Sequence, residues 1–357
     1  MHNRVVFDDM QEIADRNDYA WLEGKSVFIS GAYGMLASYI VYFFIYLNEI
    51  VLHDKIGIYA QGRNLSKMQK RFGLFCDKEY FHIITDDICS EINISKKMDY
   101  IVHAASLASP QYYATNPVDV IAPNVLGTNN LLKMAREHGT SGFLFFSSGE
   151  VYGKIEDLQH DCTEHDYGYL DIMNVRSCYA ESKRLGETLC KSYFVQYGVP
   201  ATAVRIAHTY GPTMDVYTDE RVFSEFVKNV MHNENIVMKS DGLSERYFCY
   251  LTDAVDAFLR ILKNGSRGEA YNMCNTSASM SIRGLAELLV ELFEEKNLKV
   301  IAENRIKSSR YMESPVKKSP VFDTSKLQEL GWRPQIDVKE GFWRTVMSLK
   351  NEVMDCV

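Results

Sequence analysis

The sequence predicts an α/β fold, in which a Rossmann-type, doubly wound parallel sheet is joined to a smaller mixed α/β C-terminal lobe. Three observations predict this fold. Short β-branched and aromatic runs alternate with helical stretches through residues 26–207, which indicates βαβ units with both sheet faces covered. A turn containing two glycines follows the first run and opens a helix. After Gly211-Pro212 the alternation weakens, and polar loops separate further helical patterns.

Each predicted strand is a short apolar run bounded by polar or turn residues. The predicted strands span residues 26–30, 56–60, 81–85, 100–104, 143–147 and 201–207. The predicted helices span residues 8–16, 34–47, 120–138, 176–196, 222–232, 252–262, 282–294 and 338–349. We therefore expect an N-terminal extension (1–24), a dinucleotide-binding Rossmann domain (25–207) and a third part that is mainly a substrate lobe (208–357).

The composition excludes several classes of protein. With 46% hydrophobic residues in 357, the chain can bury a substantial core. Its formal net charge of −8 gives no basic footprint for nucleic acid. The longest apolar run, residues 35–47, is short for a membrane span, and the acidic N-terminus does not resemble a signal peptide. Eight cysteines without a CxxC pair indicate reduced thiols and no metal site. We expect a cytoplasmic protein without nucleic-acid or membrane partners.

The turn Gly31-Ala-Tyr-Gly34-Met-Leu-Ala37 predicts a dinucleotide site. Gly31 permits a tight turn, Gly34 lets a pyrophosphate approach the backbone, and Ala37 lets the helix pack closely on the strand. The amides at the start of the helix would face the phosphates. Further residues expected to contact the cofactor are Met35, Leu36, Ile88, Ala104 and Ala105.

The end of the second predicted strand bears on the choice of cofactor. A Rossmann site for NAD normally has a carboxylate there, which binds the ribose 2′-hydroxyl. The segment 58–64 has no carboxylate but contains Arg63, which suits a 2′-phosphate and favours NADP. Alternatively, Arg63 is a solvated loop residue and NAD binds. Asp87 is placed either to meet the adenine or to cap the following turn.

A tyrosine and a lysine predict the catalytic pair. Tyr179 and Lys183 are four residues apart in a helical pattern and so share one face. A neighbouring ammonium lowers the pKa of a phenol, which would let Tyr179 exchange a proton near neutral pH. Ser148 follows the preceding strand and is placed to hydrogen-bond a reacting sugar oxygen. Glu150 is either a base or a cap of its loop.

These motifs resemble the extended short-chain dehydrogenase/reductases that act on nucleotide sugars, also called the NAD-dependent epimerase/dehydratase family. The resemblance covers about residues 24–345 and rests on GAYGMLA, HAAS, SSGEVYG, YAESK and RIAHTYGP. Four further stretches resemble the UDP-glucuronate decarboxylase branch in particular: ASPQYYATNP, RSCYAESKR, ERVFSEF and LGWRP.

The resemblance implies roles for further residues. Tyr179 and Lys183 match the catalytic pair, and Ser148 matches its hydroxyl partner. Tyr113 would lie near the sugar, or it is a core aromatic. Arg221 and Arg246 would bind the nucleotide diphosphate, although Arg246 could be a surface charge. The remaining positions implied at the substrate are His208, in place of the usual asparagine and alternatively a packed strand-end residue, and Lys318, in place of a decarboxylase arginine.

The departures from the family pattern favour one reaction. The dehydratases carry an aspartate where this chain has Gly149, so glucose 4,6-dehydration is not expected. Lys318 keeps a positive charge but lacks the bidentate fork that suits a carboxylate. We expect an NADPH-dependent reductase of a dTDP- or UDP-linked 4-keto-6-deoxyhexose, serving surface-polysaccharide sugar synthesis. The alternatives are a UDP-glucuronate decarboxylase, a 4-epimerase and an inactive regulatory Rossmann protein. A homodimer through the helices at 120–138 and 176–196 is also expected.

Overall fold

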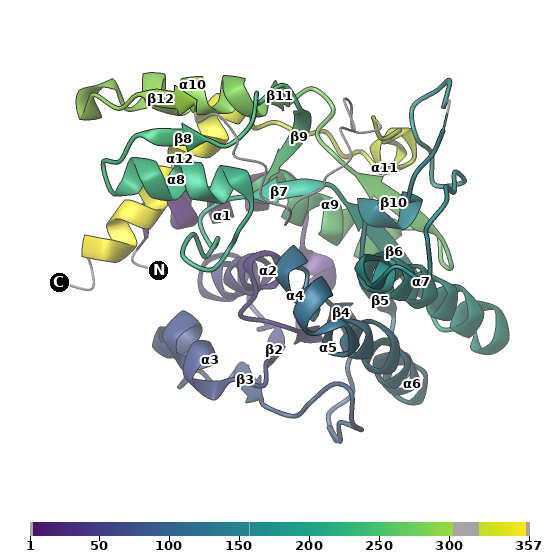
Figure 1. Ribbon diagram of the computed structural model, residues 1–357. Helices are drawn as coiled ribbons and strands as arrows, with labels where there is room; N and C mark the ends of the chain where they lie inside the picture. Colours follow the sequence, from purple (N-terminus) through teal and green to yellow (C-terminus); the bar gives the residue numbers. More distant parts are fainter. Residues whose placement is uncertain (1–2, 157, 303–320, 355–357) are drawn as a thin grey trace.

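A computed structural model gives the structure of residues 3–156, 158–302 and 321–354. Its centre is a seven-stranded parallel sheet in the order β10-β6-β5-β4-β1-β2-β3 (Figure 1). The strands are β1 (Ser26–Ser30), β2 (Gly57–Gln61), β3 (Phe81–Ile84), β4 (Tyr100–His103), β5 (Gly142–Ser148), β6 (Ala201–Ile206) and β10 (Ala270–Met273). The predicted doubly wound α/β fold is confirmed.

Strand order reverses between β1 and β4, so the carboxyl ends of these strands flank a switch point. The parallel register pairs Ser30 with His103 and Ser148 with Ile206 at this edge. Side chains of β1 and β5 are buried on both faces, as the continuous apolar runs predict for a sheet covered on both sides. The glycine turn after β1 and the serine loop after β5 therefore open on the same edge.

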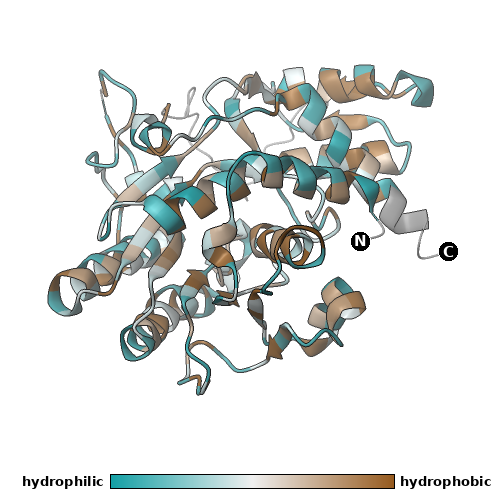
Figure 2. Cartoon of the chain, turned by 180° about the vertical axis from the view of Figure 1, so that it is seen from behind, coloured by the Kyte–Doolittle hydropathy of each residue, from teal (hydrophilic) through white to brown (hydrophobic). Residues whose placement is uncertain are grey.

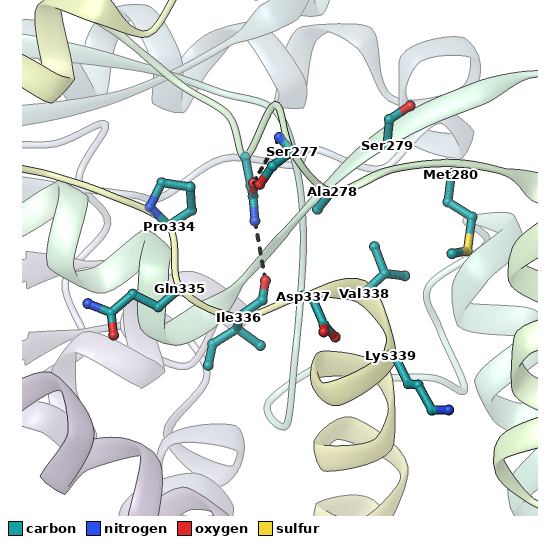
Figure 3. A pocket seen from close by; sticks show the side chains of 11 residues that line it. Ser277, Ala278, Ser279, Met280, Pro334, Gln335, Ile336, Asp337, Val338 and Lys339 are labelled. Carbon is teal, nitrogen blue, oxygen red and sulfur yellow. Dashed lines mark hydrogen bonds between the residues drawn. The ribbon is translucent and has the colours of Figure 1, made fainter.

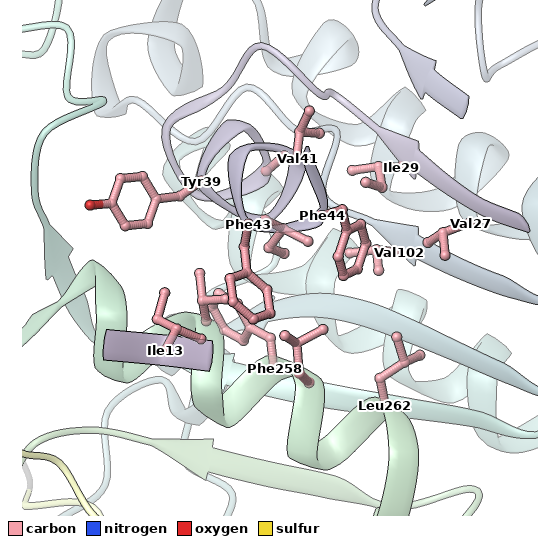
Figure 4. Packing of buried hydrophobic residues seen from close by; sticks show 14 of the residues in the cluster. Ile13, Val27, Ile29, Tyr39, Val41, Phe43, Phe44, Val102, Phe258 and Leu262 are labelled. Atoms are coloured by element: carbon pink, nitrogen blue, oxygen red, sulfur yellow. The ribbon is translucent and has the colours of Figure 1, made fainter. Parts of the chain in front are cut away.

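One face of the sheet is covered by α2 (Met35–Tyr46) and α9 (Leu251–Asn264). Most of α2 is buried because the sheet, α9 and the N-terminal helix α1 (Arg4–Asp15) surround it. Figure 2 shows α2 in brown, and Figure 4 shows Phe43 and Phe44 between Val102 of the sheet and Phe258 of α9. The apolar run at 35–47 is thus a buried helix. In the described part of the chain, no helix is long and apolar enough to cross a membrane.

The other face is covered by α6 (Thr128–His138) and α7 (Cys178–Tyr197), and α5 (Pro117–Ala122) packs against α7. The helix predicted at 120–138 is interrupted by a π turn at Pro123–Gly127, at a proline that has no N–H to donate. Asn124 in this turn donates to the hydroxyl of Ser182 at 3.0 Å, which ties the turn to α7. Two further helices, α3 (Leu65–Phe72) and α4 (Pro110–Thr115), follow β2 and β4.

The second lobe lies beside the carboxyl edge of the sheet (Figure 1). Its elements are β7 (His208–Tyr210), α8 (Val222–Met231), β8 (Ile236–Met238), β9 (Glu245–Tyr250), β11 (Ser279–Ser281), α10 (Ile282–Leu292), β12 (Val300–Ala302) and α12 (Val338–Met354), whereas α11 (Ser325–Glu329) packs on β10 of the central sheet. β11, β9 and β7 form one small sheet, and β12 and β8 form another. Although α9 and β10 come after residue 207, they pack on the central sheet. The division at 207/208 remains a proposal.

The N-terminal helix α1 packs against α2, α9 and α12. Its carboxylate Asp9 is fully buried and accepts hydrogen bonds from the hydroxyls of Tyr39 and Tyr250, and it pairs with Arg344 of α12 at 2.6 Å. The predicted short helix at 8–16 is present and begins earlier, at Arg4. Because its partners come from both parts of the chain, α1 joins the central sheet to the second lobe.

Candidate active site

The glycine turn adopts a conformation that its glycines make possible. Gly31 has a φ of +64°, and a Cβ there would lie 2.7 Å from the Cα of Ala105. Gly34 is the N-cap of α2, and no side chain caps the helix. The first amides of α2 therefore have no side-chain partner and are available to an anion. The predicted residues Gly31, Gly34, Ala104 and Ala105 are brought together at this edge.

A buried serine and histidine hold the β1 and β4 ends together. The hydroxyl of Ser30 accepts from the amides of Ala104 and Ala105, each at 3.1 Å, and lies 2.7 Å from His103 Nδ1. His103 Nε2 lies 3.1 Å from the Pro123 carbonyl, which can only accept, so this nitrogen carries the proton. Burial lowers the pKa of His103 to about 3, helped by the charge of Lys183. Sequence reasoning did not assign a role to either residue.

The end of β2 is organised by Gln61, another residue that sequence reasoning missed. Its side-chain oxygen accepts from the Gly31 amide at 3.1 Å, and its side-chain nitrogen donates to the Asp86 carbonyl at 2.7 Å. Gln61 is buried and uncharged. The end of this strand therefore holds a neutral amide rather than a carboxylate. The available sequence signal was that an uncharged polar residue, Gln61, ends the second strand, where a carboxylate is usual.

Arg63 is mostly exposed and pairs with Asp87, at 3.1 Å between Nη1 and Oδ2. Asp87 also accepts from the Cys89 amide at 2.9 Å, so it caps its own turn. These contacts hold the pKa of the Asp87 carboxyl below its usual range, although partial burial opposes them. Arg63 therefore lies near the end of β2, where the adenosine of a dinucleotide is expected, but its charge is paired with the carboxylate of Asp87. Ile88 is buried next to Gly127 of the π turn.

Ser148, Tyr179 and Lys183 are brought together between β5 and α7. Tyr179 is only 7% exposed, and the Ser148 hydroxyl lies near enough to its phenol to lower the phenol pKa. The ammonium of Lys183 lies 5.7 Å from the centre of the Tyr179 ring and donates to the Phe146 carbonyl at 2.6 Å. Both side chains therefore share one face of the helix, as their spacing predicts.

The ionisation of this pair differs from the expectation. Burial raises the pKa of the Tyr179 phenol, and Glu150 raises it further. The hydrogen bond of Ser148 and the charges of Arg176 and Arg221 lower it by less. Burial also lowers the pKa of Lys183 to about 7. The expectation that the lysine brings the phenol pKa down to neutral is therefore wrong for the protein alone, because desolvation disfavours both charged forms.

Tyr113 stacks on Tyr179, with ring centres 4.9 Å apart and planes 13° from parallel. Tyr113 is 1% exposed, so it is a buried aromatic that also touches the catalytic candidate. The guanidinium of Arg176 lies 4.5 Å from the centre of the Tyr113 ring. It pairs with both carboxylate oxygens of Glu150, at 2.9 and 3.2 Å. Glu150 is therefore held by an arginine that sequence reasoning did not single out.

Gly149 lies between Ser148 and Glu150 at the start of a 3₁₀ turn, Gly149–Tyr152. A Cβ at this position would lie 2.5 Å from Cζ of Phe322. Phe322 also contacts Tyr152, at 5.2 Å between ring centres. No signal in the sequence indicates this contact, because the two residues are far apart in the chain. The space that a side chain at 149 would need is filled by an aromatic ring.

The second lobe contributes His208, Arg221 and Arg246. His208 lies at the exposed start of β7, and the protein around its ring, with the charges of Arg246 and Arg221, lowers its pKa. Arg221 pairs with Asp219 at 2.5 Å and donates to the Thr209 carbonyl at 3.2 Å. The positive charge of Arg221 also lowers the pKa of the Tyr179 phenol. The two arginines and the histidine thus lie on the second-lobe side of the same site, while Lys318 lies outside the described residues.

The site residues fit a dinucleotide. Besides the uncapped α2 amides, the hydroxyl of Ser106 and the side-chain oxygen of Asn124 are buried without a hydrogen-bond partner. Ser106 directly follows Ala105, and a ligand at the carboxyl edge of the sheet would supply a partner for its hydroxyl. Asn124 is fully buried, and its side-chain nitrogen donates to the Val120 carbonyl and to the Ser182 hydroxyl. A separate pocket of about 310 Å³, lined by Asn275 and segments 277–280 and 334–339, contains none of the predicted residues (Figure 3).

Comparison with known proteins assigns the chain to a family. Residues 27–274 match the model of the NAD dependent epimerase/dehydratase family. UDP-glucuronic acid decarboxylase 6 of Arabidopsis thaliana is 32% identical over 327 residues, which cover 91% of this chain and 89% of that protein. The dTDP-D-glucose 4,6-dehydratase of Homo sapiens is 29% identical over 335 residues, which cover 90% and 89%.

The fold is shared with solved structures. The crystal structure of UDP-glucose 4-epimerase from Thermotoga maritima superposes with a TM-score of 0.77 at 23% identity. The match covers 92% of this chain and 99% of that one. At this identity the likeness concerns the fold alone.

Proposed function

We propose that this chain, which belongs to the NAD dependent epimerase/dehydratase family, exchanges a hydride between a nicotinamide cofactor and C4 of a nucleotide-diphosphate sugar. The observation that carries the proposal is the pair of buried side chains Tyr179 and Lys183 beside the half-buried Ser148 at the carboxyl edge of the sheet. In a keto sugar, the C4 oxygen would accept a hydrogen bond from Ser148 and a proton from Tyr179 as C4 is reduced. A bound nicotinamide cofactor supplies the hydride.

Other residues of the chain would bind the cofactor and the sugar diphosphate. Gly31, Gly34 and the first amides of α2 would hold the pyrophosphate, and Lys183 would hold the ribose next to the nicotinamide. Arg221, Arg246 and His208 would bind the sugar diphosphate, because guanidinium groups make charge-assisted hydrogen bonds to phosphate. Arg221 would have to share or leave its partner Asp219 to do so. The substrate would be linked to UDP or dTDP.

For the cofactor we propose NADP, with NAD as the alternative. Gln61 puts an uncharged, buried amide at the end of β2, so no carboxylate on that strand repels a 2′-phosphate. Arg63 is exposed next to it, and three further cations follow in α3, which are Lys67, Lys70 and Arg71. The pairing of Arg63 with Asp87 favours NAD instead, because it places a carboxylate at that end of the site.

For the net reaction we propose reduction of a 4-keto-6-deoxyhexose. Phe322 fills the space beside Gly149, so the protein has no acid there to protonate a departing hydroxyl. Glu150 is bound by Arg176. Reduction needs neither an acid at 149 nor a free Glu150, only a hydride donor, Tyr179 and Ser148. Such an enzyme would serve the synthesis of deoxysugars for surface polysaccharides.

Decarboxylation of UDP-glucuronate is the second candidate, and its support is the 32% identity to a UDP-glucuronic acid decarboxylase over 91% of the chain. The two reactions differ in what they consume. Reduction oxidises one NADPH for each sugar, whereas decarboxylation recycles its bound cofactor and releases carbon dioxide.

The deciding experiment gives the purified protein two substrates in parallel. With NADPH and a dTDP- or UDP-4-keto-6-deoxyhexose, we expect NADPH oxidation and a 6-deoxyhexose with a free 4-hydroxyl. With UDP-glucuronate, we expect little or no carbon dioxide. Release of carbon dioxide and UDP-xylose, with no net change in NADPH, would overturn reduction in favour of decarboxylation.

A further inference from the structure

Four side chains next to the catalytic candidates contact one another in series: Tyr179, Tyr113, Arg176 and Glu150. Tyr179 of α7 stacks on Tyr113 of α4, the guanidinium of Arg176 lies over the Tyr113 ring, and Arg176 pairs with Glu150 in the turn after β5. Arg176 belongs to a separate 3₁₀ turn, Val175–Ser177, which leads into α7. The contacts therefore connect the catalytic tyrosine to the loop that carries its hydroxyl partner, Ser148.

Tyr179 and Tyr113 are buried, whereas Arg176 and Glu150 are partly exposed to solvent. Tyr113 is buried, and its hydroxyl donates to the Ala108 carbonyl at 2.9 Å. The side chains of Arg176 and Glu150 are 51% and 40% exposed. An ion pair this exposed adds little to folding stability. Folding stability therefore does not explain why Arg176 binds both oxygens of Glu150 and also lies over the Tyr113 ring.

The charges around the phenol supply that explanation. The charged and titratable groups that face Tyr179 are Glu150 from the β5 turn, Arg176 from its own turn, Arg221 before α8, Lys183 one turn along α7, and Tyr113 from α4. Glu150 is the carboxylate among them, and its negative charge opposes loss of the phenolic proton. Arg176 binds both of its oxygens and so offsets that charge.

We propose that Arg176 is a positioning residue for proton transfer at Tyr179: it braces the Tyr113 ring on which the phenol is stacked, and it neutralises Glu150 so that this carboxylate does not oppose ionisation of the phenol. The proposal rests on the proposed function in one respect, that Tyr179 moves the proton. Arg176 contacts Tyr113 and Glu150, and it acts on Tyr179 through them. Glu150 is correspondingly a partner of Arg176 rather than a free base.

The test is a spectroscopic titration that needs no sugar substrate. Tyrosinate absorbance is followed against pH in the protein saturated with NADP, for the wild type and Tyr179→Phe, whose difference isolates the phenol at 179. Arg176→Ala should raise the midpoint of that step by about one pH unit, because Glu150 is then unopposed. Arg176→Ala combined with Glu150→Gln should return the midpoint towards the wild-type value. Glu150→Gln alone should lower it.

Two further variants separate charge from packing. Arg176→Lys keeps a positive charge for Glu150 but loses the planar group over Tyr113, so its midpoint should lie between those of the wild type and Arg176→Ala. Arg136→Ala is the matched control, because Arg136 lies 4.0 Å from the centre of the Tyr197 ring on the α6–α7 surface. Removing that arginine–tyrosine contact should not move the Tyr179 step.

Three results would overturn the proposal. These are an unmoved midpoint in Arg176→Ala, a midpoint that Glu150→Gln neither lowers alone nor restores in the double variant, and a wild-type protein with no step that depends on Tyr179. If Arg176→Ala does not fold, Glu150→Gln alone decides. Failure to transfer hydride to any nucleotide sugar, with these shifts intact, would refute the proposed function and leave the role of Arg176 standing.

Discussion

At the scale of single residues, burial controls the ionisation of the site. It lowers the pKa of Lys183 to about 7 and that of His103 to about 3, and it raises that of Tyr179. Each shift favours the neutral form. At neutral pH His103 and Tyr179 are therefore neutral, and Lys183 is about half protonated.

Tyr179→Phe tests the proton carrier. The variant keeps the ring that stacks on Tyr113 and loses only the hydroxyl. We expect turnover to fall by about three orders of magnitude or more, because general acid catalysis is removed, while the Kd for NADP or NAD changes little. Tyr113→Phe is the matched control and should retain most activity. A Tyr179→Phe enzyme with a near-normal rate would remove this residue from the mechanism.

Gly149→Ala tests the contact with Phe322. The new methyl group would overlap the ring of Phe322, at 2.5 Å from Cζ, so we expect a loss of about 1–3 kcal/mol in the free energy of unfolding. Adding Phe322→Leu should recover part of the loss, because the shorter side chain leaves room for the methyl group. Urea denaturation measures both. Equal stabilities for Gly149→Ala and the wild type would show that the space is open.

Arg63→Ala tests the choice of cofactor. If Arg63 leaves Asp87 to bind a 2′-phosphate, its removal should weaken NADP binding about tenfold or more, since charge-assisted hydrogen bonds are worth about 1.5–3 kcal/mol. NAD binding should change little. Calorimetric titration with each nucleotide provides the comparison. Tighter binding of NAD than NADP by the wild type would contradict the NADP assignment.

At the scale of elements, helix α1 packs against both the central-sheet domain and the second lobe. Asp9 is buried among Tyr39, Tyr250 and Arg344, which belong to α2, β9 and α12. Burial raises the pKa of this carboxyl from 3.8 to about 6, although its hydrogen bonds and Arg344 oppose the shift. Between these two values the folded protein holds a proton that the unfolded chain has lost. The contribution of Asp9 to stability therefore increases as the pH falls through 6.

Asp9→Asn removes this titration. The stability of the wild type relative to Asp9→Asn should rise by about 1 kcal/mol between pH 7 and pH 5, as the linkage of this shift requires. Urea denaturation at the two pH values measures it. Asp8→Asn is the control, because Asp8 is exposed on the same helix and pairs only with Arg4 among the described residues. A difference that stays constant, or that shrinks towards pH 5, would show that Asp9 is already ionised in the folded protein.

The elements that local patterns determine could be predicted, and those that tertiary contacts determine could not. The six strands of residues 26–207 and the long helices lie close to their predicted ranges because each has an apolar run or a helical period. The seventh strand, Ala270–Met273, was not predicted, because it is short and contains Asn272. That side chain donates to the carbonyls of Cys162 and Asp323, and these partners come from distant segments.

At the scale of the whole molecule, the site was predictable where the motif itself holds the chemistry. Tyr179, Lys183, Ser148 and the glycine turn lie together because the carboxyl ends of parallel strands meet at one edge. The contacts of Arg176, Gln61 and Phe322 depend on how separate segments pack, which residue spacing does not encode. The same packing changes the ionisation of Tyr179 from what its helical neighbour alone would predict.

The central claim is that Tyr179 serves hydride exchange at C4 of a nucleotide sugar. Its most direct test uses NADPH carrying deuterium at both C4 positions of the nicotinamide and a dTDP- or UDP-4-keto-6-deoxyhexose, with the product examined by NMR. We predict deuterium at C4 of the sugar with the wild-type protein, and none above background with Tyr179→Phe. Deuterium at another carbon, or no transfer by the wild type, would contradict the claim.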